Sequence, residues 1–378
     1  MKDVIKLNAI SGVVSEVFKN DYQLVESSDN AVGIMVRSYN MHEYKPSASV
    51  LAVARAGAGT NNIPVKEYAN DGIVVFNTPG ANSNAVKELV IAALFLSSRK
   101  ISQGITWSNG LKDGEKTVAE QVEKGKKVFA GCEVLGKTLG VYGLGAIGRK
   151  VASVATSLGM SVVGYDPYLP KDAKIEGVTI VDNKEKLFSS CDYITFHVPL
   201  TNETRDLVCK KSISTMKDGV KIINLSRDAV VNTADILTAT KSGKVSCYVC
   251  DFPCAELINN DNVICIPHLG ASTEEAEDNC AIMAAKQMVD YVENGNIVNS
   301  VNFPSVSAVR NGFRTVVLYS GECDCEIKSA VKGAKINAIN SAFKNGFAVT
   351  LIDTAEKLEQ TVLDSIASVK GVIKVRNI

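Results

Sequence analysis

The stretch VYGLGAIGR, residues 141–149, decides the fold of this chain. It follows an apolar run and continues into KVASVA (150–155), which has the pattern of a helix. Gly143, Gly145 and Gly148 give the spacing G-x-G-x-x-G. In a dinucleotide-binding turn the first glycine permits the tight bend, the second admits a pyrophosphate, and the third lets the helix pack against the strand. Because the amides of the helix then face the phosphates, this stretch predicts a dinucleotide site.

An acidic residue follows at the distance that such a site requires. The next apolar run, SVVGY (161–165), predicts a second strand that ends at Asp166, 18 positions after Gly148. A carboxylate there holds the ribose hydroxyls of an adenosine and repels a 2′-phosphate. The pattern therefore favours NAD over NADP as cofactor. The alternative is a doubly wound fold with an accidental triple glycine.

Bulk composition excludes several classes of partner. The 378 residues are enough for about two or three domains. The 41 basic and 41 acidic side chains balance, so no nucleic acid or anionic membrane is expected as a partner. The N-terminus lacks the pattern of a signal peptide, and no apolar run is long enough to span a membrane. We therefore expect a cytoplasmic protein.

The ten cysteines are scattered along the chain. Without an export signal, this distribution indicates reduced thiols in the cytosol rather than a disulfide framework. Cys247, Cys250 and Cys254 are close enough to suggest a metal site. However, no second cluster with matching spacing follows, and Cys250 directly precedes Asp251, which has the position of a functional residue. Packing at a strand end is the favoured interpretation, and no metal is predicted.

The first hundred residues contain short apolar runs that end in polar groups: GIMVR (33–37), VLAVAR (50–55) and IVVFN (73–77). Continuous apolar strands separated by helices predict a parallel sheet that is covered on both faces. Ligands of such sheets bind beyond the carboxyl ends of the strands. Arg37 and Arg55 lie at two of these ends and form a candidate cradle for an anionic substrate. The alternative is that both arginines are solvated strand ends.

The pattern then changes from strand to helix and back. Residues 84–98 predict a helix that is apolar nearly all round and therefore buried between layers. Residues 100–127 are polar and lysine-rich, and we expect them to cross from one domain to the next. Further strands ending in polar groups complete a doubly wound domain; they are predicted at 178–181, 193–200, 220–227, 245–251 and 263–268.

Three ionisable residues follow these later strands: Arg227, Glu256 and His268. Transfer of a hydride from an alcohol to nicotinamide requires a base for the hydroxyl proton, and an imidazole has a suitable pKa. The imidazole needs a carboxylate that fixes its tautomer, and the substrate needs a cation, for which arginine offers a planar pair of donors. The three residues supply these groups. Each alone could equally be a bland surface charge.

At this point the chain resembles the D-isomer-specific 2-hydroxyacid dehydrogenases. The resemblance runs from about residue 33 to residue 303. It rests on seven blocks in the family's order: RAGAG (55–59), NTPG (77–80), GLGAIG (143–148), FHVPL (196–200), NLSR (224–227), DFPCAE (251–256) and PHLGAST (267–273).

The resemblance implies a fold and a set of roles. It implies an α/β protein with two doubly wound parallel-sheet domains: a discontinuous substrate domain (1–98 and 270–302), which closes over substrate, and an NAD domain (99–269). Arg227, Glu256 and His268 would be catalytic, and Asp251 would hold the nicotinamide carboxamide. The implied cofactor-binding positions are Gly143, Gly145, Ala146, Ile147, Gly148, Asp166, His197, Val198, Pro199, Thr204, Leu225, Ser226, Arg227, Asp251, His268, Gly270 and Ala271.

The resemblance also implies a phosphorylated substrate. Arg37 matches an arginine that grips a substrate phosphate, and Lys127 (or Lys126) resembles a lysine that reaches the phosphate from a neighbouring subunit of a homodimer or homotetramer. The implied substrate-binding set is Arg37, Arg55, Ala56, Gly57, Ala58, Asn77 and Lys127. The expected reaction is NAD-dependent oxidation of 3-phosphoglycerate. The alternatives are a hydroxypyruvate or D-lactate type of dehydrogenase and a non-catalytic NAD-sensing protein.

Residues 310–378 have a separate pattern of strands and helices that resembles a small α+β ACT domain, a serine-sensing module. Two departures from the family concern function. Asp228 replaces the glycine that usually follows the catalytic arginine, and it could pair with Arg227 or point outward. SGECDC (320–325) replaces the usual Asn-x-Pro-Gly turn. This departure leaves two alternatives: the domain senses serine, or it only holds subunits together.

Overall fold

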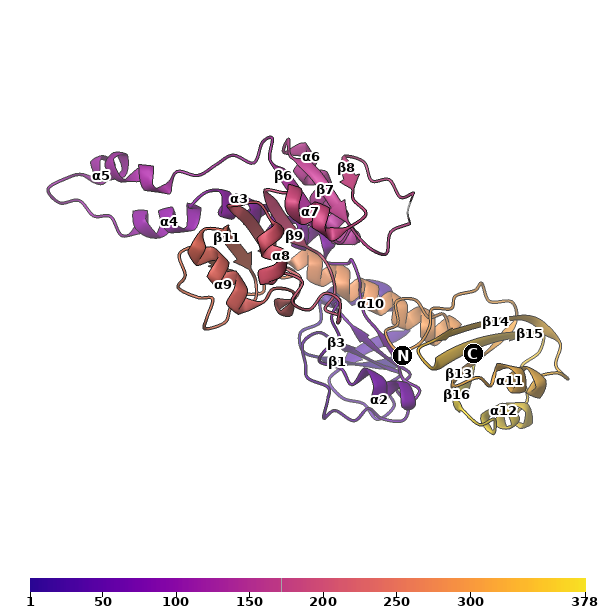
Figure 1. Ribbon diagram of the computed structural model, residues 1–378. Coiled ribbons are helices and arrows are strands. Elements are labelled where there is room, and N and C mark those ends of the chain that lie inside the picture. Colours follow the sequence, from indigo (N-terminus) through magenta and orange to yellow (C-terminus); the bar gives the residue numbers. More distant parts are fainter. Residues whose placement is uncertain (171) are drawn as a thin grey trace. The chain divides into compact units, whose positions relative to one another are not determined.

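The computed structural model describes residues 1–170 and 172–378. The chain forms two compact units, one made of residues 1–82 and 274–378 and the other of residues 83–273 (Figure 1). The first unit therefore contains both ends of the chain. These boundaries differ from the predicted domains at three places: residues 83–98 and 270–273 cluster with the second unit, and the C-terminal residues cluster with the first.

The first unit is built on a five-stranded parallel sheet in the order β2-β1-β3-β4-β5. One face is covered by α2 (Val65–Asn70), and the other packs against α1 (Ser15–Phe18) and the long helix α10 (Glu274–Asn294). The strands are β1 (Lys2–Leu7), β2 (Tyr22–Val25), β3 (Gly33–Val36), β4 (Ala52–Arg55) and β5 (Val74–Phe76). Burial on both faces explains why these strands are continuously apolar.

The second unit is built on a seven-stranded parallel sheet in the order β12-β11-β10-β9-β6-β7-β8. Helices α7 (Lys184–Ser190), α8 (Lys210–Thr215) and α9 (Thr233–Ser242) cover one face. The strands are β6 (Thr138–Tyr142), β7 (Ser161–Tyr165), β8 (Val178–Ile180), β9 (Tyr193–Phe196), β10 (Val220–Asn224), β11 (Val245–Cys250) and β12 (Val263–Cys265). The predicted doubly wound parallel sheets are confirmed.

Helices α3 (Ser83–Ser98) and α6 (Ala146–Ser157) cover the other face of this sheet. Val90 and Leu94 of α3 are almost fully buried in one apolar cluster with Val141 of β6 and Val151 of α6. The predicted burial of the helix at 84–98 is therefore confirmed for the face that carries Val90 and Leu94, but Ala92 and Phe95 on the opposite face are exposed, so the helix is not buried all round. Its apolar surface is matched by the nucleotide-binding sheet, which is why it belongs to the second unit.

Residues 99–133 form an arm that extends away from the sheet of the second unit (Figure 1). It contains α4 (Ile101–Asn109), α5 (Val118–Gly125) and the 3₁₀ turn η2 (Lys126–Phe129), and no residue of these elements is buried. The prediction that this segment crosses from one domain to the next is wrong. The helix before the arm, α3, and the strand after it, β6, lie in the same unit. A polar, loosely packed segment is equally compatible with an excursion from one unit.

The C-terminal residues form an antiparallel sheet in the order β14-β15-β13-β16 with two helices. The elements in chain order are β13 (Phe313–Ser320), α11 (Asp324–Ala330), β14 (Ile336–Lys344), β15 (Phe347–Thr354), α12 (Gln360–Ala367) and β16 (Val372–Asn377). This confirms the predicted α+β ACT-like fold. The helices cover one face of the sheet.

The other face of the C-terminal sheet packs within the first unit. Val316 and Leu351 share an apolar cluster with Tyr291 of α10. Arg376 of β16 donates hydrogen bonds of 2.7 Å to the carbonyls of Tyr291 and Val292, and its guanidinium lies over the Tyr291 ring. The C-terminal domain is thus joined to the last turn of α10 by both apolar and polar contacts.

A search of residues 1–170 and 172–378 reveals no helix with the length and apolar character needed to traverse a lipid bilayer.

Candidate active site

The glycine turn has the backbone geometry that its spacing predicts. Gly143 has φ +94°, and a Cβ at this position would lie 2.5 Å from the His197 carbonyl oxygen. A Cβ on Gly148 would lie 1.9 Å from the Gly143 oxygen, so only glycine lets α6 approach the turn this closely. Around Gly145, in contrast, a Cβ would meet nothing within 4 Å. This open position is where the backbone can approach a pyrophosphate.

The start of α6 leaves its amides without a side-chain cap. Gly145 is the N-cap, and Ala146 and Ile147 form the first turn. The first amides of a helix have no partner within the helix, and they favour an anion placed at this end. The turn therefore fits the phosphates of a dinucleotide.

Asp166 lies beside this turn, directly after β7. Its Oδ2 accepts a hydrogen bond of 2.9 Å from the Leu144 amide, and its Oδ1 accepts one of 2.9 Å from the Tyr168 amide. Each carboxylate oxygen has a second lone pair. Asp166 is thus held in a fixed orientation next to the glycine turn and can still accept hydrogen bonds from ribose hydroxyls.

His197, Val198 and Pro199 follow β9 at the same edge of the sheet. His197 keeps some exposed surface, but desolvation of the ring lowers its pKa to about 3, so the imidazole is neutral at physiological pH. Its Nε2 lies 3.2 Å from the Thr195 hydroxyl. The Thr204 hydroxyl donates to the Pro199 carbonyl at 2.7 Å and so closes this loop.

The loop after β10 presents Arg227. Asn224 organises it: its side-chain amide donates to the Arg227 carbonyl at 2.8 Å, and its oxygen accepts the Ser226 hydroxyl at 2.8 Å. Leu225 and Ser226 are buried, whereas Arg227 is exposed. Within the described residues, 1–170 and 172–378, no ion pair joins Arg227 to Asp228, which begins the 3₁₀ turn η3 (Asp228–Val230).

Asp251 follows β11 and has an unusual environment. It is only 2% exposed, and its Oδ1 has no hydrogen-bond partner in the described part of the chain. Burial raises the pKa of this carboxyl, while the charges of His268 and Arg227 act in the opposite direction. The three predicted site residues therefore lie within electrostatic reach of one another. A buried oxygen without a donor fits the amide group of a nicotinamide.

His268 is exposed and follows β12. Its backbone N–H donates to the Asp251 carbonyl at 3.2 Å, and its ring lies edge-to-face on Phe252, with 5.2 Å between ring centroids. Gly270 is buried, and a Cβ there would lie 3.5 Å from the Asp251 carboxylate. This segment, which continues into Ala271, therefore lies against the carboxylate.

Glu256 is exposed on the loop after β11. The pKa of its carboxyl is lowered by a hydrogen bond from its own backbone amide and by the Cys254 thiol. Among residues 1–170 and 172–378, no hydrogen bond or ion pair joins Glu256 to His268. The structure therefore brings Arg227, Asp251 and His268 together, and the predicted contact between Glu256 and His268 is not formed.

The predicted substrate residues other than Lys127 lie in the first unit. The Arg55 Nε donates to the Asn62 side chain at 3.1 Å, and Gly57 has φ +156° and would place a Cβ 2.4 Å from Arg55 Nη1. Asn77 Nδ2 donates to the Ala58 carbonyl at 2.6 Å. These contacts fasten the loop of Arg55, Ala56, Gly57 and Ala58 to the end of β5.

Arg37 follows β3, and its Nη2 lies 2.7 Å from Oε1 of Glu277 on α10. Burial raises the pKa of Cys280, and the charges of Arg37 and Arg55 partly offset this, so both arginines act on one thiol of α10. Lys127 is exposed in the arm of the second unit. Asn62, Asn224 and Glu277 were not among the predicted site residues. The only sequence signal at Glu277 is that of an acidic residue in the first turn of a helix.

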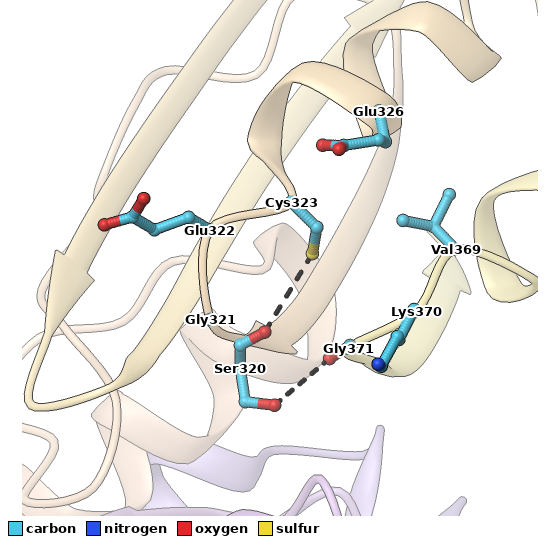
Figure 2. A pocket seen from close by; sticks show the side chains of 8 residues that line it. All are labelled: Ser320, Gly321, Glu322, Cys323, Glu326, Val369, Lys370 and Gly371. Atoms are coloured by element: carbon cyan, nitrogen blue, oxygen red, sulfur yellow. Dashed lines mark hydrogen bonds between the residues drawn. The ribbon is translucent and has the colours of Figure 1, made fainter.

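A pocket of about 420 Å³ lies in the C-terminal domain, at the turn where the sequence departs from the ACT pattern (Figure 2). Ser320, Cys323 and Glu326 line one side, and Val369 to Gly371 line the other. The Ser320 N–H donates to the Gly371 carbonyl at 2.8 Å and joins the two sides.

Among the described residues, no group of three or more His, Cys, Asp or Glu side chains could hold a metal ion.

Comparison with known proteins agrees with this geometry. Residues 101–270 match the model of the D-isomer specific 2-hydroxyacid dehydrogenase NAD-binding domain. A protein named D-3-phosphoglycerate dehydrogenase from Methanocaldococcus jannaschii is 31% identical over 367 residues, which cover 94% of this chain and 67% of that protein. One of the same name from Archaeoglobus fulgidus is 34% identical over 328 residues, covering 84% and 60%. The chain thus spans about two thirds or less of the length of these relatives.

Solved structures show the same fold. NAD⁺-bound 3-phosphoglycerate dehydrogenase from Entamoeba histolytica aligns with a TM-score of 0.64 and 26% identity, covering 80% of this chain and 98% of that one. D-2-hydroxyisocaproate dehydrogenase aligns with a TM-score of 0.67 at 22% identity, covering 80% and 100%, and supports the fold alone. The glycine turn, Asp166 and the residues Arg227, Asp251 and His268 lie within the matched range of 101–270. The chain therefore belongs to the D-isomer specific 2-hydroxyacid dehydrogenase family, with NAD as the cofactor of the matched domain.

Proposed function

We propose that this protein oxidises 3-phosphoglycerate at C2 to 3-phosphohydroxypyruvate, the first step of serine biosynthesis, with NAD as hydride acceptor. The observation that carries the proposal is the grouping of Arg227, Asp251 and His268 at the ends of β10, β11 and β12 of an NAD-binding domain. Relatives named D-3-phosphoglycerate dehydrogenase support the choice of substrate.

The roles of the residues follow from their chemistry. Asp251 would hold the carboxamide of NAD through its unpartnered oxygen, and NAD, when bound, would accept the hydride. His268 accepts the proton of the substrate hydroxyl as C2 loses its hydrogen with the electron pair, and a carbonyl forms at C2. Arg227 donates hydrogen bonds to the substrate carboxylate. Glu256 stabilises the imidazolium once its side chain turns toward His268.

The phosphate of the substrate is bound by Arg37 and Arg55, assisted by the loop of Ala56 to Ala58 and by Asn77. We assign substrate binding to the sheet of the first unit and catalysis to the second unit. Guanidinium groups at two neighbouring strand ends support this assignment, since arginine binds phosphate oxygens through paired N–H donors. Phosphorylated substrates would then be preferred over glycerate or lactate.

The test is a steady-state assay of the full chain with a panel of substrates. We expect NAD reduction with 3-phosphoglycerate and NADH oxidation with phosphohydroxypyruvate, both abolished in His268→Ala and Arg227→Ala. Binding of NADH is measured beside activity to show that the variants still fold. Robust turnover with only unphosphorylated acids would refute the substrate assignment. The panel is repeated with serine, because the turn at 320–325 lines a pocket.

A second candidate is an unphosphorylated 2-hydroxy acid such as glycerate or D-lactate. One observation favours it: Arg37 is already paired with Glu277, which offsets the charge that a phosphate would need. A third reading, an NAD-sensing protein without turnover, predicts NADH binding and no rate with any member of the panel.

The arm suggests that the enzyme is a homo-oligomer, as a dimer or tetramer. Ile105 is 55% exposed and Val128 is 66% exposed, and no residue of α4, α5 or η2 is buried. A second copy that covers these side chains would also place Lys127 near the partner. Sedimentation of Ile105→Asp, compared with Lys112→Asp as a charge control, tests this: only the first should dissociate.

We also place the enzyme in the cytoplasm. Its ten cysteines are all free thiols, several of them buried. A reducing compartment keeps thiols in this state. Fractionation of the source cells, followed by measurement of activity in each fraction, checks the location.

A further inference from the structure

Two thiols meet at the ends of neighbouring strands of the second unit. Cys250 is the last residue of β11 and Cys265 is the last residue of β12, and the two are register partners in this parallel pair. Their sulfur atoms lie 3.9 Å apart. Cys250 is fully buried and Cys265 is partly exposed, and both face the apolar cluster covered by α7, α8 and α9.

This geometry is close to that of a disulfide. Neighbouring strands lie about 4.8 Å apart, within the range of about 4.4–6.8 Å that a disulfide requires between its Cα atoms. The sulfur atoms must approach from 3.9 Å to about 2.0 Å, a change that rotation of the side chains about Cα–Cβ largely provides. The rest of the approach requires the two strand ends to move toward each other.

The strand ends that carry these thiols also carry the site. The Ile266 N–H donates to the Cys250 carbonyl at 2.8 Å, and the next contact along is the His268 N–H to the Asp251 carbonyl at 3.2 Å. A cross-link between Cys250 and Cys265 would therefore pull on the same backbone ladder that positions the Asp251 carboxylate and the His268 ring. Asp251 is one position after Cys250, and His268 is three positions after Cys265, so the effect of the cross-link has only a short distance to travel along each chain segment.

We propose that Cys250 and Cys265 form a reversible disulfide under a peroxide oxidant, and that this bond displaces Asp251 and His268 and lowers NAD(H) binding and turnover. The Cys265 sulfur attacks one oxygen of the peroxide, giving a sulfenic acid and releasing the other oxygen as water. The Cys250 sulfur then displaces the sulfenic oxygen as a second water. Two thiols lose two electrons and two protons, and one peroxide is reduced to two waters.

The resting state of the pair is the dithiol. Burial raises the pKa of Cys250 to about 12, and burial also raises the pKa of Cys265. The thiolate is the reactive form, so both groups react slowly without a strong oxidant. The pair of thiols would therefore form its disulfide only under sustained oxidation. In its absence the thiols pack as small apolar groups.

The chain provides matched controls. Cys247 lies on the same strand as Cys250, but its side chain joins the apolar cluster on the opposite face of the sheet. Cys254 lies on the following loop, is partly exposed and belongs to the same cluster as the pair. Cys247→Ala should therefore leave the response to peroxide intact. Cys254→Ala tests whether this third thiol of the cluster takes part in the cross-link, and it should also leave the response intact.

The experiment uses the full reduced chain treated with hydrogen peroxide and then alkylated. Mass spectrometry of non-reduced peptides should find Cys250 joined to Cys265. NADH affinity and NAD reduction should fall by about tenfold or more, because a shift of about 1 Å at a catalytic site costs up to about a hundredfold. Dithiothreitol should restore both. Cys250→Ala and Cys265→Ser should each abolish the cross-link and the loss.

The turnover readout rests on the proposed function, whereas the cross-link and NADH affinity rest only on the NAD-binding domain. Absence of the Cys250–Cys265 peptide under conditions that oxidise Cys254 would overturn the proposal. A cross-linked protein with unchanged NADH affinity and rate would also overturn it. If Cys250→Ala does not fold, Cys265→Ser, at a partly exposed position, still decides.

Discussion

Arg37 and Glu277 form an ion pair, with Nη2 2.7 Å from Oε1, although they are 240 positions apart in the chain. The pair joins the end of β3 to the first turn of α10 in the first unit. Both side chains are partly exposed, 34% and 41%, so the pair is screened by solvent. The residue that we assign to the substrate phosphate is therefore already oriented by a carboxylate, and binding of phosphate must compete with it.

Glu277→Gln should lower the KM for 3-phosphoglycerate by about twofold to fivefold, because a partly exposed ion pair contributes up to about 1 kcal/mol. Gln still donates and accepts hydrogen bonds, so the fold should be kept. Arg37→Ala should act in the opposite direction and raise KM at nearly constant kcat. Steady-state kinetics at low and moderate salt measure both. An unchanged KM in Glu277→Gln, with Arg37→Ala impaired, would show that the carboxylate does not compete.

Asp251→Asn should separate stability from cofactor binding. Burial raises the pKa of the Asp251 carboxyl, so its ionised form destabilises the folded chain. Stability from this group is therefore largest below the ordinary value of 3.8 and is lost as pH rises through the raised folded value. The variant should melt at a higher temperature than the parent near neutral pH, and the gain should shrink as pH falls.

The same variant should bind NADH about fivefold more weakly, since a neutral acceptor loses about 1 kcal/mol relative to a charged one. Fluorescence titration with NADH measures the affinity, and calorimetry across pH measures the stability. A variant that is less stable than the parent at neutral pH would contradict the assignment of a destabilising ionised carboxylate.

Substitutions in the glycine turn should have distinct effects. Gly145→Ala places a methyl group in open space, so unfolding free energy should change by less than about 0.5 kcal/mol, whereas NADH affinity should fall by about tenfold as the methyl meets the pyrophosphate. Gly148→Ala places a methyl 1.9 Å from the Gly143 oxygen and should cost about 1–3 kcal/mol of stability. Chemical denaturation and NADH titration are measured on both. Equal losses of stability would show that Gly145 is structural.

The C-terminal domain contains a buried ion pair whose loss should be costly. Arg314 Nε lies 2.6 Å from Asp353 Oδ1, and the two side chains are 0% and 1% exposed. Arg314 also donates to the carbonyls of Asn294 and Ala308. Arg314→Met leaves an unpaired buried carboxylate and should destabilise this domain by about 3–5 kcal/mol. Hydrogen exchange over β13 and β15 in urea locates the loss.

The acid sensitivity of the parent follows from the same pair. Burial alone would raise the pKa of Asp353, but the hydrogen bonds from Arg314 and the Asn311 amide, together with the charges of Arg314 and Arg310, outweigh it, and the net pKa is lowered. Stability from the pair is therefore present above 3.8 and is lost as pH falls through the lowered folded value. The control Arg314→Met/Asp353→Leu should recover much of the stability and lose this acid sensitivity.

The sequence alone determined what local backbone geometry and strand periodicity control. The spacing of Gly143, Gly145 and Gly148 allows one turn, and the structure has it, with Asp166 beside it as predicted. Polar residues after apolar strands identified Arg227 and His268, because the carboxyl ends of parallel strands share one edge of the sheet. The α+β fold of the C-terminal domain followed from its resemblance to an ACT domain, whereas the antiparallel pairing of its strands is known from the structure.

The tertiary structure decided which distant residues meet. The apolar helix α3 could pack on either sheet by its pattern, and it fits the one that contains Val141. The unpaired Asp251 oxygen, the Arg37–Glu277 pair and the Cys250–Cys265 thiols depend on register and side-chain packing. Local propensity carries no information on such contacts, since they arise only when elements far apart in the chain bury surface against each other.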